Sequence, residues 1–180
     1  MRILLMGFLF SLFSKSSDAQ PIPKSIYDFK VKALDESVIN FASFNGKKIL
    51  IVNTASKCGY TPQYKNLEAL HQRYKDQLVI VGFPANNFLW QEPGDNATIA
   101  EFCQKNYGVS FVMAAKISVK GNDMAPIYQW LTQKKYNHVE NSSVKWNFQK
   151  YLLDEKGNLI QMFSPGVDPL DAAIIQAIEK

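Results

Sequence analysis

Apolar and polar positions along the first half of the chain follow patterns typical of alternating strands and helices. Two short extended segments, 27–33 and 38–41, flank a polar turn and predict a β-hairpin. Residues 48–54 are mostly apolar and rich in β-branched side chains, which predicts a buried central strand. A helical spacing follows, and its apolar face consists of Tyr64, Leu67, Leu70 and Tyr74.

The second half of the chain continues this alternation. A buried strand is expected at 78–83, and the helix after it takes Asp95 or Asn96 as its N-cap and stops at Gly108. The remaining expected elements are a strand at 111–119, a helix at 125–134, a hairpin of 148–153 with 158–163, and a closing helix at 168–179. This order predicts an α/β fold of the thioredoxin kind, with a mixed central sheet covered by helices and an N-terminal β-hairpin.

The N-terminus has the pattern of a cleavable signal peptide. Arg2 precedes an apolar run at 3–13 that is too short to span a bilayer, and the following polar stretch ends in the small-x-small sequence Ser17-Asp18-Ala19. We therefore expect a signal peptide at 1–19 and a single domain at 20–180, exported to a periplasm or secreted. A disordered or lightly membrane-associated N-terminus is the alternative. Because no later apolar stretch approaches transmembrane length, no stable membrane insertion is expected.

Charge and composition exclude some classes of protein. The chain has 20 basic and 16 acidic residues, a net charge of +4, and its lysines are scattered without any nucleic-acid-binding motif. No nucleic-acid partner is therefore expected. The two histidines, His71 and His138, have no Cys, Asp or Glu at metal-ligand spacing, so neither a metal nor another cofactor is expected.

Cys58 lies between the predicted buried strand and the helix that follows it. Thr61 is the expected N-cap of that helix and Pro62 suits its first turn, which would hold the thiol near the positive end of the helix dipole. Such a site favours the thiolate, and Lys57 adds a positive charge beside it. Gly59 is expected to leave the sulfur open to a small substrate. A thiolate of this kind attacks the O–O bond of a peroxide and becomes a sulfenic acid; core packing or a simple disulfide are the alternatives.

Four stretches of the chain, in order, resemble the motifs of the glutathione peroxidase family: NTASKCGYTPQYKNLEALHQRY, GFPANNFLWQEPG, EFCQKNYGVSF and VKWNF. The resemblance runs from about Tyr27 to the C-terminus. It implies a thiol peroxidase that reduces hydrogen peroxide and organic hydroperoxides in the response to oxidative stress. Members share a catalytic tetrad of a peroxidatic cysteine, a Gln, a Trp and an Asn, and the motifs place these roles on Cys58, Gln91, Trp146 and Asn147.

The chemistry of these side chains fits the implied roles. Gln91 and Asn147 offer amide N–H donors and Trp146 an indole N–H, and none of the three is a base. Their expected function is to stabilise the thiolate and to polarise the peroxide oxygens. The alternatives are an ordinary core aromatic for Trp146 and a surface turn for 91–94.

The chain also departs from the family's motifs near this site. Ala85 replaces the usual Cys, Asn87 the usual Gln, and Val112 a common Pro, while Leu89 and Trp90 make a bulkier loop. These changes concern the shape of the substrate pocket and leave the implied reaction intact.

Cys103 decides how the enzyme is recycled. Two cysteines in an exported protein are by default a structural disulfide, and Cys103 on the apolar side of its helix is alternatively a buried thiol. Its position matches the resolving cysteine of the non-selenium members, which implies a disulfide with Cys58 that a thioredoxin-like protein reduces, after local unwinding of the helix. Glutathione is the weaker candidate, because its carboxylates favour arginine and the domain retains only Arg73. A monomer or loose dimer is expected, since the stretch between Trp130 and Trp146 lacks the longer insertion associated with tetrameric members.

Three other classes of function compete with the peroxidase. A thioredoxin-like disulfide reductase would carry Cys-x-x-Cys, whereas Thr61 occupies the second position here. A redox sensor would pass oxidation from Cys58 to a partner protein through the same sulfenic acid. A structural secreted domain would have an inert Cys58.

Overall fold

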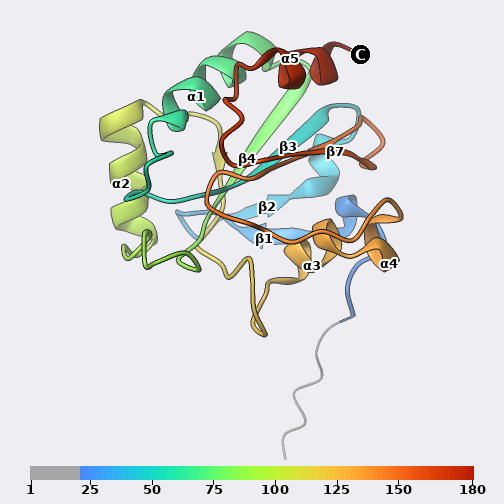
Figure 1. Ribbon diagram of the computed structural model, residues 1–180, viewed down its shortest axis with the longest axis horizontal. Coiled ribbons are helices and arrows are strands. Elements are labelled where there is room, and N and C mark those ends of the chain that lie inside the picture. The colour runs from blue at the N-terminus through green and yellow to red at the C-terminus, as the bar shows by residue number, and fades with distance from the viewer. Residues whose placement is uncertain (1–20) are drawn as a thin grey trace, which may run out of the picture.

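The central sheet has five strands in the order β5-β4-β3-β6-β7, within residues 21–180, which are the residues that the computed structural model describes (Figure 1). The parallel strands are β3 (Lys48–Thr54), β4 (Leu78–Pro84) and β5 (Val112–Met113), with β3 next to β4 and β4 next to β5. β6 (Lys150–Leu153) runs antiparallel to β3, and β7 (Leu159–Phe163) antiparallel to β6. The sheet is therefore mixed, as predicted.

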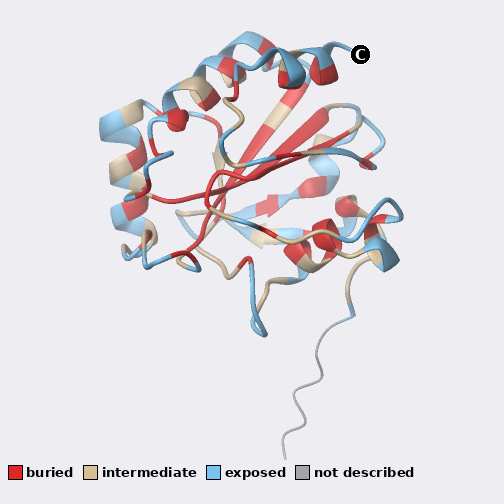
Figure 2. Cartoon of the chain, viewed as in Figure 1, coloured by how far each residue is buried: buried red, intermediate tan, exposed pale blue. Residues whose placement is uncertain are grey.

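Helices cover both faces of this sheet. α1 (Gln63–Tyr74), α2 (Asn96–Tyr107) and α5 (Ala172–Glu179) pack on one face through an apolar cluster that includes Leu50 and Leu152 of the strands. On the other face, α3 (Pro126–Thr132) and α4 (Lys134–Asn137) pack with the N-terminal hairpin around Ile51 and Tyr151. Figure 2 shows the strands between them as the most continuously buried part of the chain. The predicted thioredoxin-like α/β fold is confirmed.

The N-terminal hairpin consists of β1 (Lys30–Lys32) and β2 (Val38–Asn40), which pair antiparallel in a separate two-stranded sheet. The predicted hairpin is therefore correct, but its first residues are not extended. Ile26–Asp28 forms a short 3-10 helix because Ser25 and Asp28 cap each other's backbone N–H groups. A second 3-10 helix, Phe41–Phe44, follows β2.

Three expected elements differ most in their bounds from the structure. The strand predicted at 111–119 is limited to β5, since the regular pairing with β4 ends at Met113. The backbone N–H groups of Ala114 and Ile117 still donate to the carbonyls of Gly82 and Pro84, and Ala114 also forms an isolated bridge with Ala33. The helix predicted at 125–134 is interrupted at Gln133, whose backbone is extended, and is divided into α3 and α4. The closing helix begins only at Ala172, because the side chain of Asp171 caps it. The signal peptide predicted at 1–19 lies outside the described residues.

Both predicted boundaries of α2 are correct. The side chain of Asp95 accepts a hydrogen bond from the backbone N–H of Thr98 and is the N-cap. Gly108 ends the helix in a left-handed conformation, with φ of 60°, which glycine adopts without a steric penalty.

No helix of residues 21–180 has the length and apolar character needed to cross a membrane.

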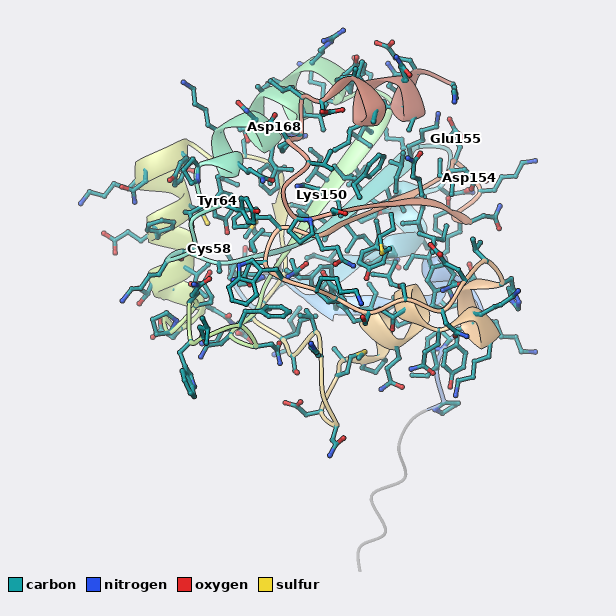
Figure 3. All side chains as sticks on the ribbon, in the orientation of Figure 1. Cys58, Tyr64, Lys150, Asp154, Glu155 and Asp168 are labelled. Carbon is teal, nitrogen blue, oxygen red and sulfur yellow. The ribbon has the colours of Figure 1, made fainter. Side chains whose placement is uncertain are left out.

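Lys150 attaches the loop between β7 and α5 to the rest of the fold. Its side chain is fully buried, and Nζ donates hydrogen bonds to Gln63 Oε1 of α1 and to the backbone carbonyls of Pro165 and Val167 (Figure 3). Burial lowers the pKa of Lys150 to about 8, whereas the charge of Asp168 acts in the opposite direction. One side chain of β6 thus connects α1 with the segment that leads into α5.

Candidate active site

Cys58 lies in a tight turn that joins the carboxyl end of β3 to α1. The backbone N–H of Cys58 donates to Thr61 Oγ1 at 2.9 Å, and the same hydroxyl donates to the carbonyl of Ala55 at 2.9 Å. Since this turn occupies the Thr61 hydroxyl, the prediction that Thr61 caps α1 is wrong. The N-cap is Pro62, which has no side-chain capping bond.

The sulfur of Cys58 is more enclosed than its sequence context predicts. The residue is only 8% exposed and belongs to the apolar cluster between the sheet and α1, although its neighbours Lys57, Gly59 and Tyr60 are exposed. Within residues 21–180 the only hydrogen bond to Sγ comes from the backbone N–H of Tyr60, at 3.4 Å. A backbone N–H in this position stabilises negative charge on the sulfur. Because Cys58 is buried while its neighbours are exposed, it lies at the edge of the core.

Gln91 and Asn147 come together from segments 56 residues apart in the sequence. The Asn147 side chain is fully buried, and its Nδ2 donates to Gln91 Oε1 at 2.9 Å. The backbone carbonyl of Gln91 also accepts a hydrogen bond from the backbone N–H of Lys57 at 3.0 Å. This bond connects the Gln91–Asn147 pair to the loop of Cys58. Because Oε1 is the acceptor, the amide nitrogen of Gln91 remains as a donor.

Trp146 lies next to this pair and contacts both apolar clusters. Its ring is half-buried and packs against Phe88 with ring centroids 5.3 Å apart, while its carbonyl accepts from Asn53 Nδ2 at 3.0 Å. The structure therefore brings Gln91, Trp146 and Asn147 together beside the loop of Cys58. Their catalytic roles stay a prediction, because no side chain of the three is hydrogen-bonded to Sγ in the described residues.

The loop that follows Phe88 has an unusual backbone. Leu89 and Trp90 both adopt positive φ, at 50° and 53°, and their side chains are 69% and 77% exposed. Such φ values are strained for large side chains, so the surrounding contacts must hold the loop in this form. The two bulky side chains predicted beside the site, Leu89 and Trp90, are thus largely exposed to solvent. Gln91 follows them directly in the chain.

Glu92 is a buried acidic residue that the sequence analysis did not single out. It is 1% exposed, its backbone N–H donates to Asn86 Oδ1, and its Oε1 accepts from Ser56 Oγ at 2.7 Å. Burial raises the pKa of the Glu92 carboxyl, while the Ser56 hydrogen bond and the charges of Lys116 and Lys57 lower it. Because Pro93 and Gly94 follow Glu92, the alternative reading of 91–94 in the sequence was a surface turn.

Cys103 is the second thiol on the same face of the sheet. It is 2% exposed on α2, as its place on the apolar side of the predicted helix indicated, and both cysteines are free. Burial raises the pKa of the Cys103 thiol to about 11, and the charge of Glu92 acts in the same direction. A cavity of about 190 Å³ separates α2 from the loop of Cys58, lined by Ser56, Lys57, Glu92, Pro93, Gly94, Thr98, Ile99 and Phe102.

Solved structures of similar fold extend over most of the chain. The structure described as Trgpx in apo form has 36% sequence identity and a TM-score of 0.65, covering 87% of this chain and 96% of its own. The structure of T. cruzi GPX1 has 31% identity and a TM-score of 0.64, covering 86% and 93%. A Mycobacterium tuberculosis dsbF structure shares only the fold, at 15% identity and a TM-score of 0.57 with 88% and 99% covered.

Sequence comparisons identify the family. The chain is 51% identical over 140 residues to the glutathione peroxidase-like peroxiredoxin gpx1 of Schizosaccharomyces pombe, which covers 77% of this chain and 87% of that protein. It is 47% identical to the glutathione peroxidase-like peroxiredoxin GPX5 of Chlamydomonas reinhardtii, with 86% and 94% covered. The sequence profile of the family described as glutathione peroxidase matches residues 26–132. The chain belongs to the glutathione peroxidase family.

Proposed function

We propose that this chain is a thiol peroxidase in which Cys58 attacks the O–O bond of hydrogen peroxide and organic hydroperoxides. The observation that supports the proposal most directly is the convergence of the Gln91–Asn147 pair on the loop of a free Cys58. The curated relatives with the name peroxiredoxin support the same activity.

The reaction begins with the thiolate of Cys58. Its sulfur bonds to one peroxide oxygen, the O–O bond breaks, and the other oxygen leaves as water or an alcohol after it takes up a proton. The Tyr60 N–H stabilises the thiolate before the attack. The amide of Gln91 and the indole of Trp146 donate hydrogen bonds to the oxygen on which charge develops, and Asn147 holds Gln91 in position.

In the second half of the proposed cycle, Cys103 attacks the sulfenic acid and the resulting disulfide is reduced by a thioredoxin-like protein. Because Cys103 is 2% exposed on α2, this helix has to open locally before the two sulfurs reach bonding distance. Glutathione is the second candidate reductant. The described chain offers a single arginine, Arg73, whose guanidinium lies near Glu179 at 3.5 Å, and this favours the thioredoxin-like reductant.

A steady-state assay separates the two reductants. The chain is incubated with hydrogen peroxide and either thioredoxin with its reductase or glutathione with its reductase, and NADPH consumption is followed. Turnover with thioredoxin alone is expected. Turnover only with glutathione would contradict the proposed recycling while leaving the peroxidase intact, and absence of turnover with both would contradict the proposed function.

Substitutions of the three donors are expected to slow the first step without abolishing it. Gln91→Ala, Trp146→Phe and Asn147→Ala each remove one hydrogen-bond donor or its support, and loss of a preorganised donor costs about 10²–10³ in rate at sites of this type. The measurement is the second-order rate of Cys58 oxidation in single-turnover stopped flow. Wild-type rates in all three variants would show that the assignment of the tetrad is wrong.

We also propose that the protein is exported, with cleavage after Ala19. The support comes from the N-terminal sequence, which combines a short apolar run with small residues at Ser17 and Ala19. N-terminal sequencing of the exported protein is expected to begin at Gln20. A mature protein that begins at Met1 would contradict the proposal.

A further inference from the structure

Asn53 is a polar residue in β3, a strand that is buried throughout. It lies near the carboxyl end of the strand, shortly before Cys58, where β-branched and aromatic side chains are the usual choice. The residue is fully buried, and within residues 21–180 its Oδ1 has no hydrogen-bond partner. A buried amide with an unpaired oxygen destabilises a fold relative to an apolar side chain, so core packing alone does not account for an asparagine at this position.

Hydrogen bonds join Asn53 to the segment that carries Trp146 and Asn147. The side-chain Nδ2 of Asn53 donates to the backbone carbonyl of Trp146 at 3.0 Å. The backbone carbonyl of Asn53 accepts from the N–H of Phe148 at 2.6 Å, and its own N–H donates to the carbonyl of Gln149 at 3.4 Å. These bonds hold the chain on both sides of Asn147, and only the bond to Trp146 depends on the Asn53 side chain.

The side-chain bond of Asn53 lies where the regular pairing of β3 with β6 ends. The last paired residues are Val52 and Lys150, and Phe148, shortly before β6, has a φ of 66°. A positive φ is strained for a large side chain and persists only where the surrounding contacts hold it. Asn53 Nδ2 bonds to the Trp146 carbonyl on the other side of this strained residue, so it fixes the direction of the backbone there.

We propose that Asn53 is a positioning residue of the peroxidase site, because its side chain fixes the backbone at Trp146 and Asn147. The inference rests on the proposed function, in which the Trp146 indole donates to the peroxide and Asn147 holds Gln91. β3 then contributes to both parts of the site. Its chain continues into the turn of Cys58, and its Asn53 side chain binds the segment that carries the donors. A single buried strand thus sets the placement of the donors relative to the sulfur.

Loss of the Asn53 side chain is expected to slow the reaction with peroxide. Asn53→Ala removes the donor to the Trp146 carbonyl and keeps both backbone bonds. Since a misplacement of about 1 Å can cost about 10²-fold in rate, the second-order rate of Cys58 oxidation by hydrogen peroxide should fall by about 10–10²-fold in stopped flow. Alkylation of Cys58 by iodoacetamide should keep its wild-type rate, because that reaction requires the thiolate but no donor to a departing peroxide oxygen.

A double-mutant cycle tests whether Asn53 acts through its neighbours. The reference is the double variant Trp146→Phe/Asn147→Ala, which lacks the side chains that Asn53 is proposed to place. Addition of Asn53→Ala to this reference should leave its oxidation rate nearly unchanged, whereas independent effects would multiply.

Trp130→Phe is the matched control for a lost buried donor. The side chain of Trp130 is 3% exposed, and its Nε1 donates to the backbone carbonyl of Lys24 at 3.3 Å. It belongs to the apolar cluster around α3, on the face of the sheet opposite to the cluster that contains Cys58. The oxidation rate of Trp130→Phe should equal that of the wild type, even where its thermal stability falls.

The possible outcomes are distinct. Oxidation of a folded Asn53→Ala variant at the wild-type rate would overturn the proposal, and so would an equal loss in alkylation, an equal loss in Trp130→Phe, or a full further loss in the double-variant background. If Trp146→Phe/Asn147→Ala reacts as fast as the wild type, the proposed roles of those two residues fail and the role of Asn53 fails with them. If Asn53→Ala does not fold, Asn53→Leu takes its place under the same criteria, because leucine keeps the branching at Cγ and fills the space.

Discussion

Replacement of Cys58 by Ser is expected to abolish peroxide turnover. A hydroxyl at this position cannot form the sulfenic acid, and the Tyr60 N–H that supports the thiolate would face a neutral group. Loss of a covalent nucleophile reduces turnover by a factor on the order of 10⁴ or more. The measurement is hydroperoxide consumption by purified Cys58→Ser with a thioredoxin system, compared with the same assay without protein.

The variant changes one buried sulfur to oxygen and keeps the backbone contacts of the turn, so its fold is expected to persist. The hydrogen bond from the N–H of residue 58 to Thr61 Oγ1 does not involve the side chain that is replaced. Unchanged near-UV circular dichroism serves as the control. Turnover near the wild-type level by a folded Cys58→Ser would exclude Cys58 as the peroxidatic residue.

Replacement of Cys103 by Ser is expected to stop the enzyme after a single turnover. Cys58 should still consume about one equivalent of peroxide, but without Cys103 no intramolecular disulfide forms for thioredoxin to attack. The trapped sulfenic acid would then oxidise further, and mass spectrometry should detect the sulfinic form of Cys58. Wild-type protein under the same conditions should lose two hydrogens instead.

Hydrogen exchange gives an independent measure of the same mechanism. In the proposed mechanism Cys103 leaves α2 to form the disulfide, so the backbone amides of 102–106 should exchange faster in the oxidised wild type than in the reduced protein. Cys103→Ala is the matched variant, because it avoids a buried hydroxyl that lacks a partner. Sustained thioredoxin-dependent turnover by Cys103→Ser or Cys103→Ala would return Cys103 to a structural role.

Hydrophobic patterning was sufficient to predict the fold class and the buried strand that leads to Cys58. The bounds of β3, at 48–54, match the prediction because every residue of that strand is buried and the pattern is unambiguous. Short elements were less predictable. The chain after Met113 is apolar enough for a strand, yet only isolated hydrogen bonds connect it to β4, and Ala114 also bridges to Ala33, a long-range contact that has no local signal.

The residues of the candidate site were proposed from motif resemblance, which could not predict the contacts among them. Motif resemblance indicated Gln91 and Asn147, whereas the hydrogen bond between them depends on how β6 pairs with β3. Thr61 was misassigned because local sequence cannot show that its hydroxyl bonds to Ala55 and Cys58. Glu92 was overlooked because a carboxylate before Pro-Gly is typical of an exposed turn, and only the tertiary structure shows its burial.

The pairing of β3 with β6 has a consequence for the order in which folding and reactivity arise. The partners of residues 49–52 in β3 are residues 150–153, about a hundred positions later in the chain, so this part of the sheet is a contact of high sequence separation that forms late. During synthesis, Cys58 emerges well before the segment that contains Trp146 and Asn147. A nascent or truncated chain that ends before Trp146 therefore carries the thiol without the side chains of Trp146 and Asn147, so under the proposed mechanism we expect peroxidase activity only after this later segment has joined the sheet.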